Sequence, residues 1–127
     1  EIYTLSLHDA LPIYNKKMAG TSGLGIIYAS EKYNVKYQGI STKEELINEL
    51  SDGKIVFAAM GNGKFATLKW NHAIVLYRYN EQNETTYVHD PLNRLNNGYV
   101  KIDTIWKEKS NDPDDLLGGY ALYSLYE

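Results

Sequence analysis

The sequence predicts an α+β fold, in which two helices precede a mostly antiparallel sheet. Three observations support this prediction. A helix-capping pattern followed by an apolar stripe at helical spacing lies near residue 45, and short β-branched and aromatic runs follow from residue 55 onward. Turn residues join most of these runs over short distances, and short connections make consecutive strands antiparallel neighbours.

The first helix is expected to begin near Leu24. Ile27 and Tyr28 follow Leu24 at helical spacing, and Thr21 or Ser22 can cap the start of the helix. The polar residues that precede this segment are expected to form a loop.

The second helix is expected over residues 42–51. Ser41 and Glu44 form the ends of a capping box, in which a hydroxyl and a carboxylate accept hydrogen bonds from backbone amides at the start of the helix. Gly53 is expected at the end, because glycine readily adopts the left-handed conformation that terminates many helices. The apolar stripe of this helix consists of Leu46, Ile47 and Leu50.

The remaining elements are expected to be strands bounded by turn residues. The run from Ile55 to Met60 is continuously apolar, which is typical of a strand buried on both faces. Asp103 is expected to cap a short helical turn after the fifth strand. In chain order, the expected strands are 35–39, 55–60, 73–77, 85–88, 99–102 and 119–126.

Two ionisable residues mark a hairpin within this sheet. His72 stands at the start of the third expected strand, and Asp90 stands at the end of the fourth. If the turn is centred on Gln82, Ile74 pairs with Asp90, and His72 lies diagonally from Asp90 on the same face. A bulge, or a turn centred between two residues, changes this register. In the expected register the carboxylate can orient the imidazole, as the third member of a catalytic triad does.

Residues 1–13 are excluded from these expectations. Their sequence, EIYTLSLHDALPI, resembles the translation of a common short-read sequencing adapter, and all thirteen codons match. We therefore expect an artefact from Glu1 to Ile13, a natural domain from Tyr14 to Glu127, and a true N-terminus upstream of this sequence.

The composition narrows the classes of function. The formal net charge is −3 and no basic stripe is present, which argues against a nucleic-acid partner. No apolar run is long enough to span a membrane. Twelve tyrosines against two phenylalanines suit strands with one face near water or a polymer ligand. The sequence holds no cysteine, so it offers no disulfide, thiolate metal site or cysteine nucleophile.

Three segments in order resemble one family: DGKIVFAAMGNG from Asp52, NHAIVLYRY from Asn71 and TYVHDP from Thr86. They are similar to the C-terminal half of papain-like cysteine peptidases of the double-glycine-leader (bacteriocin-processing) group. The resemblance covers the chain from about residue 19 onward. It implies that His72 is the catalytic base and that Asp90 orients it. The family's cysteine nucleophile and oxyanion-hole glutamine have no counterpart here and are expected upstream.

Several residues near this pair have alternative interpretations. Trp70 and Asn71 are candidates for the substrate cleft, although Trp70 is equally a core or surface residue, and Asn71 stands where the family more often has glycine. Asp90 precedes a proline and could serve only as a turn residue. His89 is expected at the surface on the opposite face. No third ligand accompanies His72 and Asp90, so neither a metal nor a cofactor is expected.

The resemblance implies a truncated cysteine peptidase domain that hydrolyses amide bonds in peptides or in cell-wall peptidoglycan. It further implies a secreted or surface protein of a Gram-positive bacterium. We expect the 127-residue chain itself to be inactive. One alternative is a non-catalytic binding module on the same fold, which recognises a leader peptide or a cell-wall polymer. Another is a transport-associated domain that recognises leader peptides, next to a transmembrane segment and an ATP-binding region.

Overall fold

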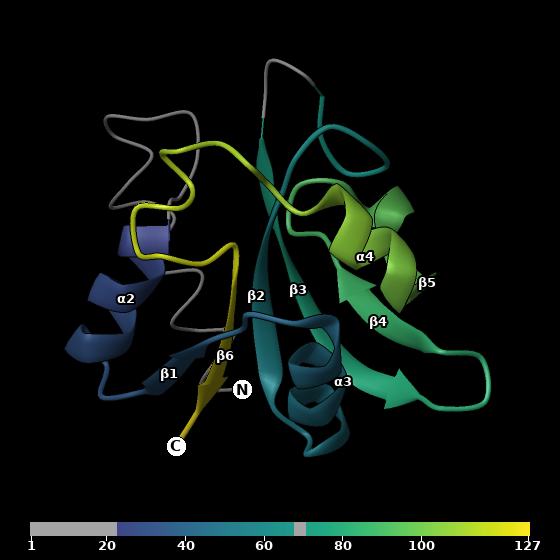
Figure 1. Cartoon of the computed structure of the whole chain (residues 1–127), viewed down its shortest axis with the longest axis horizontal. Helices are drawn as coiled ribbons and strands as arrows, with labels where there is room; N and C mark the ends of the chain where they lie inside the picture. The colour runs from purple at the N-terminus through teal and green to yellow at the C-terminus, as the bar shows by residue number, and fades with distance from the viewer. Residues whose placement is uncertain (1–22, 68–70) are drawn as a thin grey trace.

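One antiparallel sheet forms the centre of the molecule. The computed structural model describes residues 23–67 and 71–127. Within these residues, six strands are arranged in the order β1-β6-β2-β3-β4-β5 (Figure 1). The strands are β1 Lys36–Gly39, β2 Ile55–Met60, β3 His72–Asn80, β4 Thr85–His89, β5 Gly98–Lys101 and β6 Leu122–Tyr126. The helices are α2 Gly23–Lys32, α3 Lys43–Ser51, α4 Ile102–Glu108 and the 3₁₀ helix η1 Arg94–Asn96. The predicted α+β class is confirmed.

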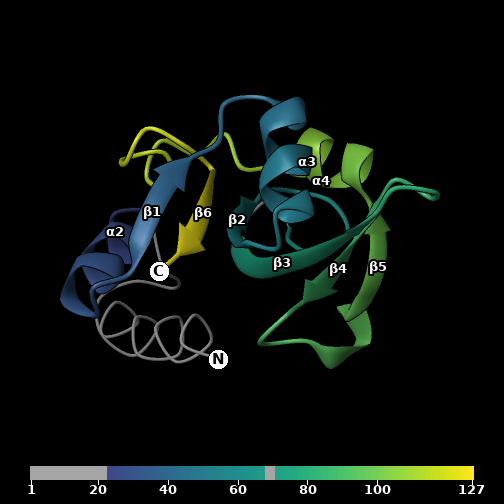
Figure 2. The same ribbon diagram turned by 90° about the horizontal axis from the view of Figure 1, so that it is seen from below.

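The side chains of β2 alternate between two apolar clusters on the two faces of the sheet. Val56, Ala58 and Met60 belong to the cluster that contains the buried residues of α3 and α4. Phe57 and Ala59 belong to the cluster that contains Ile26 of α2. Figure 2 shows α2 on one side of the sheet and α3 and α4 on the other. Helices cover both faces of β2, which explains its uninterrupted apolar sequence.

Helix α3 begins one residue later than the expected capping box. Thr42 is the N-cap, and its hydroxyl accepts a hydrogen bond from the backbone amide of Glu45 at 3.1 Å. The carboxylate of Glu45 accepts a weaker bond, 3.5 Å, from the amide of Ser41. Both Ser41 with Glu44 and Thr42 with Glu45 fit the sequence pattern, so the pattern alone does not separate them. The predicted role of Gly53 is confirmed, with φ of 83°.

The cap expected at Asp103 is wrong. Strand β5 runs directly into α4, so Lys101, the last residue of the strand, occupies the N-cap position and makes no side-chain capping bond. Asp103 lies in the first turn instead, where the helix dipole favours a negative charge. Its carboxylate accepts a hydrogen bond from Lys43 Nζ at 2.8 Å, which connects α4 to α3.

The β3–β4 hairpin carries a bulge at Arg78, whose φ is 61°. On the turn side, Tyr79 pairs with Thr86 and Asn80 with Thr85; on the other side, the pairs are Tyr77–Tyr87, Leu76–Val88 and Val75–His89. The turn is therefore centred between residues 82 and 83, and the expectation that it is centred on Gln82 is wrong. The bulge shifts the pairing by one residue and restores the expected register at the His72 end of the strand.

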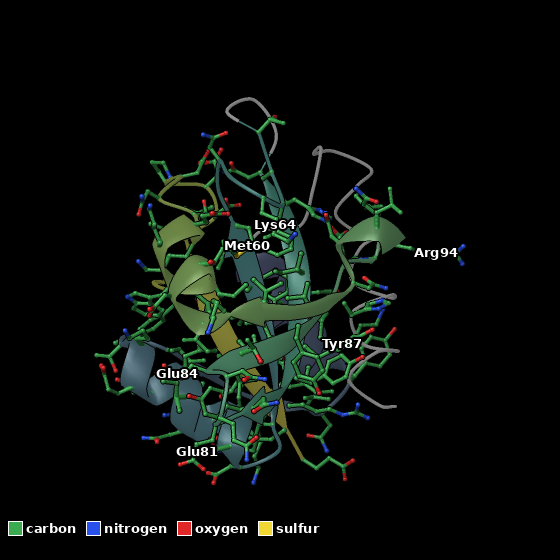
Figure 3. The ribbon with its side chains drawn as sticks, turned by 90° about the vertical axis from the view of Figure 1, so that its right-hand side faces the viewer. Met60, Lys64, Glu81, Glu84, Tyr87 and Arg94 are labelled. Carbon is green, nitrogen blue, oxygen red and sulfur yellow. The ribbon has the colours of Figure 1, made fainter. Side chains whose placement is uncertain are left out.

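Three tyrosines form a row on the face of β3, β4 and β5 that points away from α3 and α4. Tyr77 pairs with Tyr87 and Tyr87 with Tyr99, and the ring centroids are 5.1 and 5.3 Å apart. Leu76, next to Tyr77, packs in the cluster of α3 and α4, so Tyr77 faces the other way. Figure 3 labels Tyr87 in the middle of this row. Because Tyr99 is 52% exposed, this face borders water, as the tyrosine-rich composition suggested.

Candidate active site

The structure brings His72 and Asp90 together. His72 is the first residue of β3, and Asp90 directly follows β4. The imidazole Nε2 lies 2.6 Å from the carboxylate Oδ1. The side chain of Asp90 is completely buried, whereas that of His72 retains 16% of its exposure. The pair therefore consists of a shielded carboxylate and an imidazole that reaches the surface.

Four further hydrogen bonds hold Asp90 in place. Its Oδ1 accepts the backbone amides of Leu92 and Asn93, both at 3.0 Å. Its Oδ2 accepts the side-chain amide of Asn96 at 2.9 Å, and its own backbone amide donates to Asn97 Oδ1 at 2.7 Å. The loop after β4 thus wraps around the carboxylate. Asp90 is indeed a turn residue, as its position before a proline suggested, and it binds His72 as well.

The sequence pattern alone does not identify Asn96 and Asn97 as partners of Asp90. The sequence Asn96-Asn97-Gly98 indicates a turn, and the structure places η1 and the start of β5 there. The local signal is an aspartate followed within a few residues by several asparagines, because aspartate in such turns accepts backbone amides two or three residues on.

The environment of Asp90 keeps its carboxylate ionised at neutral pH. Burial by itself raises the pKa of Asp90, because it disfavours the charged form. The hydrogen bonds from Asn96, His72 and the amide of Leu92 act in the opposite direction, and the charge of His72 adds to them. Together they outweigh burial, so the pKa of Asp90 lies below its usual value of 3.8.

This arrangement leaves Nδ1 as the imidazole nitrogen that can exchange a proton. Nε2 is engaged by Asp90, which fixes the tautomer with the proton on Nε2 when the ring is neutral. None of the described residues forms a hydrogen bond with Nδ1. A nitrogen lone pair in this position can act as a general base, and the buried carboxylate holds the ring in its orientation.

The two residues before His72 are Trp70 and Asn71. Trp70 lies outside the described residues. Asn71 is partly buried, and its side-chain amide donates to Asp115 Oδ2 at 2.8 Å and to Ser110 Oγ at 3.3 Å. Asn71 is therefore held against the segment that follows α4.

His89 differs from His72 in its surroundings. It pairs with Val75, a residue of the cluster on the α2 side of the sheet, whereas the flanking residue Val88 belongs to the cluster on the side of α3 and α4. Successive side chains of a strand point to opposite faces, so His89 points away from Val88. Its side chain is partly buried rather than fully exposed.

Within residues 23–67 and 71–127, no group of three His, Asp or Glu side chains could hold a metal ion.

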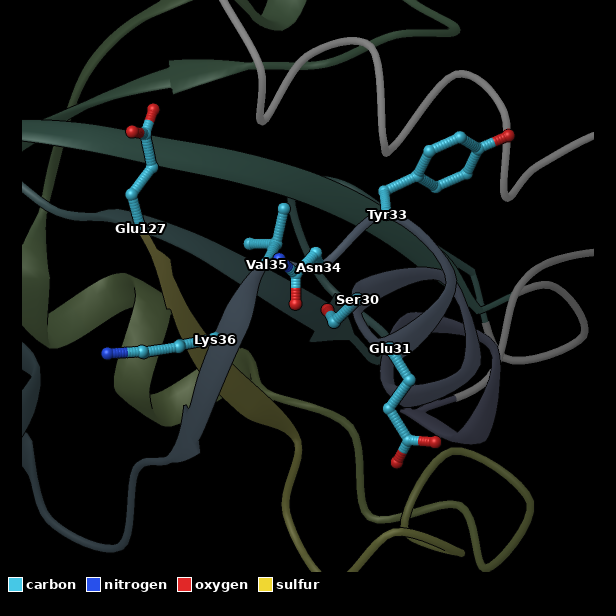
Figure 4. A pocket seen from close by; sticks show the side chains of 7 residues that line it. All are labelled: Ser30, Glu31, Tyr33, Asn34, Val35, Lys36 and Glu127. Carbon is cyan, nitrogen blue, oxygen red and sulfur yellow. The ribbon is translucent and has the colours of Figure 1, made fainter.

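A pocket of about 640 Å³ lies away from this pair. The end of α2, the start of β1 and Glu127 line it (Figure 4). It shares no residue with the His72–Asp90 pair or with the loop that wraps Asp90.

Solved structures described as peptidases share this fold. The peptidase domain of Streptococcus ComA, described as a bifunctional ABC transporter involved in quorum sensing, matches with a TM-score of 0.60 and 18% identity, over 87% of this chain and 69% of that one. A protein described as a C39-like peptidase from Bacillus anthracis matches with a TM-score of 0.56 and 18% identity, over 85% of this chain and 60% of its own. The fold is therefore similar to that of C39 peptidase domains.

The family assignment follows from the sequence as a whole. The model of the Peptidase_C39 like family matches residues 7–112, which is most of the chain, and the protein belongs to this family. The matched range begins inside residues 1–13, and the match leaves their suspected adapter origin untested. No curated protein matches the sequence.

None of the helices in the described part of the chain is long and apolar enough to cross a membrane.

Proposed function

We propose that this chain carries the base and the orienting residue of a cysteine peptidase site, and that the cysteine nucleophile belongs to sequence upstream of it. The observation that carries this proposal is the 2.6 Å contact between His72 Nε2 and a buried, ionised Asp90. The family and the fold are those of peptidases, and the pair offers the proton acceptor that a thiol nucleophile requires.

In the proposed reaction, Nδ1 of His72 takes the proton of the cysteine thiol, and the thiolate attacks the carbonyl carbon of an amide. Asp90 keeps the imidazole oriented during this transfer. The imidazolium then returns the proton to the leaving amine. Water attacks the resulting thioester with His72 again as the base, which releases the acid and restores the thiol.

The substrate in this proposal is a peptide or the peptide part of cell-wall peptidoglycan. Membership of a peptidase family supports a peptide substrate. The proposal also places the complete protein outside the cell or on the surface of a Gram-positive bacterium, in line with the sequence resemblance.

A second candidate is a binding module on the same fold. The absence of any cysteine in the 127 residues is the observation that favours it. In this alternative, a serine, alanine or glycine replaces the nucleophile, and the domain binds a leader peptide or a cell-wall polymer without cleaving it.

The coding sequence upstream of this chain separates the two candidates. We expect it to encode a cysteine after a Gly- or Asn-rich turn. The extended protein should hydrolyse peptide or peptidoglycan substrates, and an alkylating reagent should block this activity. The 127-residue chain, assayed in parallel, should show no turnover. A serine, alanine or glycine at that position, combined with binding but no hydrolysis, would establish the binding module instead.

His89 provides a matched control for the assignment of His72. In the extended protein, His72→Ala should lower kcat on the order of 10³-fold or more, because the base is lost. His89→Ala removes an imidazole next to Asp90 in sequence but on the other face of the strand, and should change kcat by no more than about twofold. Equal losses in the two variants would contradict the assignment.

A further inference from the structure

Asn71, Ser110 and Asp115 form a hydrogen-bonded group beside the candidate site, which we call the Asn71 cluster. We propose that Asp115 is a positioning residue for His72, which acts by fixing Asn71 at the start of β3. The proposal deepens the function proposed above and rests on the assignment of His72 as the base.

The Asn71 cluster is fully connected. The amide of Asn71 donates to Asp115 Oδ2 at 2.8 Å and to Ser110 Oγ at 3.3 Å. The hydroxyl of Ser110 donates to the same Oδ2 and accepts the backbone amide of Asp112 at 3.1 Å. A serine hydroxyl can donate one hydrogen bond and accept two. The hydroxyl of Ser110 makes all three of these bonds. Because Ser110 is 1% exposed, water does not replace these bonds readily.

The cluster is anchored to the strand next to His72. The backbone amide of Ser110 donates to the carbonyl of Ala59 in β2 at 2.8 Å. Ala59 pairs with Ala73 of β3, and the next pair along the ladder is Met60 with His72. The segment after α4 is thus attached to β2 at the level of the candidate base, and Asp115 extends this attachment to Asn71.

The first residues of β3 need such support because only one neighbouring strand holds them. The pairing of β3 with β4 ends at Val75 and His89, whereas the pairing with β2 continues to His72. The backbone of His72 therefore lies at an end of the sheet with a ladder on one side only, where strands open most readily. The side-chain bonds of Asn71 supply a second attachment one residue away from His72.

The orientation of an imidazole depends on its backbone as well as on its carboxylate partner. A displacement of His72 lengthens the contact between Nε2 and Asp90, since Asp90 is itself held by the loop after β4. Loss of the Asn71 cluster should therefore loosen the Nε2–Asp90 hydrogen bond while the rest of the fold remains. A purely structural contribution would lower the stability of the fold and leave that bond unchanged in the folded protein.

The test measures the hydrogen on Nε2 of His72 by NMR in the 127-residue chain. His72→Ala identifies its signal among those of the three histidines. Asp115→Ala should accelerate exchange of this hydrogen with water by about fivefold, which corresponds to the loss of one ordinary hydrogen bond from the local opening equilibrium. Asp115→Asn should restore slow exchange, because Asn71 and Ser110 both donate to a single oxygen that asparagine retains.

Asp114→Ala is the matched control, since it removes an exposed carboxylate one residue away that accepts no hydrogen bond from the described residues. It should leave the exchange rate unchanged. If Asp115→Ala does not fold, Asn71→Ala removes the same contact from the other side and replaces it in the test. Unchanged exchange in the folded variant, or equal acceleration in Asp114→Ala, would overturn the proposal. The measurement needs no catalysis, so its outcome is separate from that of the activity assays.

Discussion

His72 and Asp90 share a face of the sheet because β3 contains one residue more than β4 between this pair and the turn. The extra residue is Arg78. If the pairing next to the turn, Asn80 with Thr85, continued without a bulge, Asp90 would lie opposite Val75. Residues 72 and 75 of a regular strand point to opposite faces, so the imidazole and the carboxylate would be separated by the sheet. The bulge is therefore the local feature that makes the contact possible.

The left-handed backbone of Arg78 leads to a prediction about residue preference. We expect Arg78→Gly to be more stable than Arg78→Val by about 1–2 kcal/mol, because a β-branched residue resists positive φ. Lys36, an exposed residue of β1 without positive φ, is the control, and there valine should be the more stable substitution. Urea unfolding of the four variants measures both differences. If valine were the more stable substitution at position 78 as well as at position 36, the backbone of Arg78 would be unstrained.

Asp90 should be more important for stability than a surface carboxylate. Asp90→Ala leaves the amides of Leu92 and Asn93 and the side chain of Asn96 without their acceptor in a partly buried site, and should destabilise the fold by about 2–4 kcal/mol. Asp90→Asn retains one oxygen, and the amide of Asn96 can rotate to accept from the new donor. We expect this variant to lose no more than about 1.5 kcal/mol in chemical denaturation. Equal losses would indicate that charge rather than hydrogen bonding stabilises the loop.

The pKa of Asp90 predicts how stability depends on pH. Because the pKa is lower in the folded state than the usual 3.8, the unfolded chain binds the proton first as the pH falls. The stabilisation by Asp90 is therefore complete above about pH 4 and is lost below it. Unfolding free energies of the wild type and of Asp90→Asn, measured between about pH 6 and pH 2.5, should converge as the pH decreases.

Asp103 is the control for this experiment. Its hydrogen bond and charge interaction with Lys43 also hold its pKa below the usual value, but the pair is exposed to solvent. Asp103→Asn should therefore change the pH profile less than Asp90→Asn does. A larger effect of Asp103→Asn would mean that Asp90 is not the main source of acid sensitivity.

Deletion of residues 1–13 tests the suspected adapter segment. A segment without an evolved partner surface should contribute little, so the free energy of unfolding should change by no more than about 1 kcal/mol. Thermal and urea unfolding of the shortened chain provide the measurement. A loss of several kcal/mol would show that the segment belongs to the fold.

Features that depend on neighbouring residues were predictable from the sequence. The apolar run of β2, the stripe of α3 and the glycine after it each have a local physical cause, and the structure contains all three. The proximity of His72 and Asp90 was also expected, although by a register that ignored the bulge. The expected register centres the turn on Gln82 and contains no bulge. Each of these two errors shifts the pairing by one residue, in opposite directions, so the register at the His72 end is unchanged.

Features that depend on distant residues were not predictable. Nothing near Asp115 in the sequence indicates that it binds Asn71, which lies in another part of the chain. Asp112, Asp114 and Asp115 resemble an ordinary solvated acidic loop, and only the fold selects one of them as a partner. The pairing of Asp103 with Lys43 has the same origin, because it requires α3 and α4 to lie side by side.

The position of β6 has a consequence for synthesis on the ribosome. This strand, the last in the described chain, lies between β1 and β2, and β1 joins the sheet only through β6. A nascent chain that has not yet released residues 122–126 therefore leaves β1 unpaired and an edge of β2 open to other strands. Such chains should be recognised by chaperones and cut readily by proteases until residues 122–126 emerge, and this domain should gain its protection only then, in a single step.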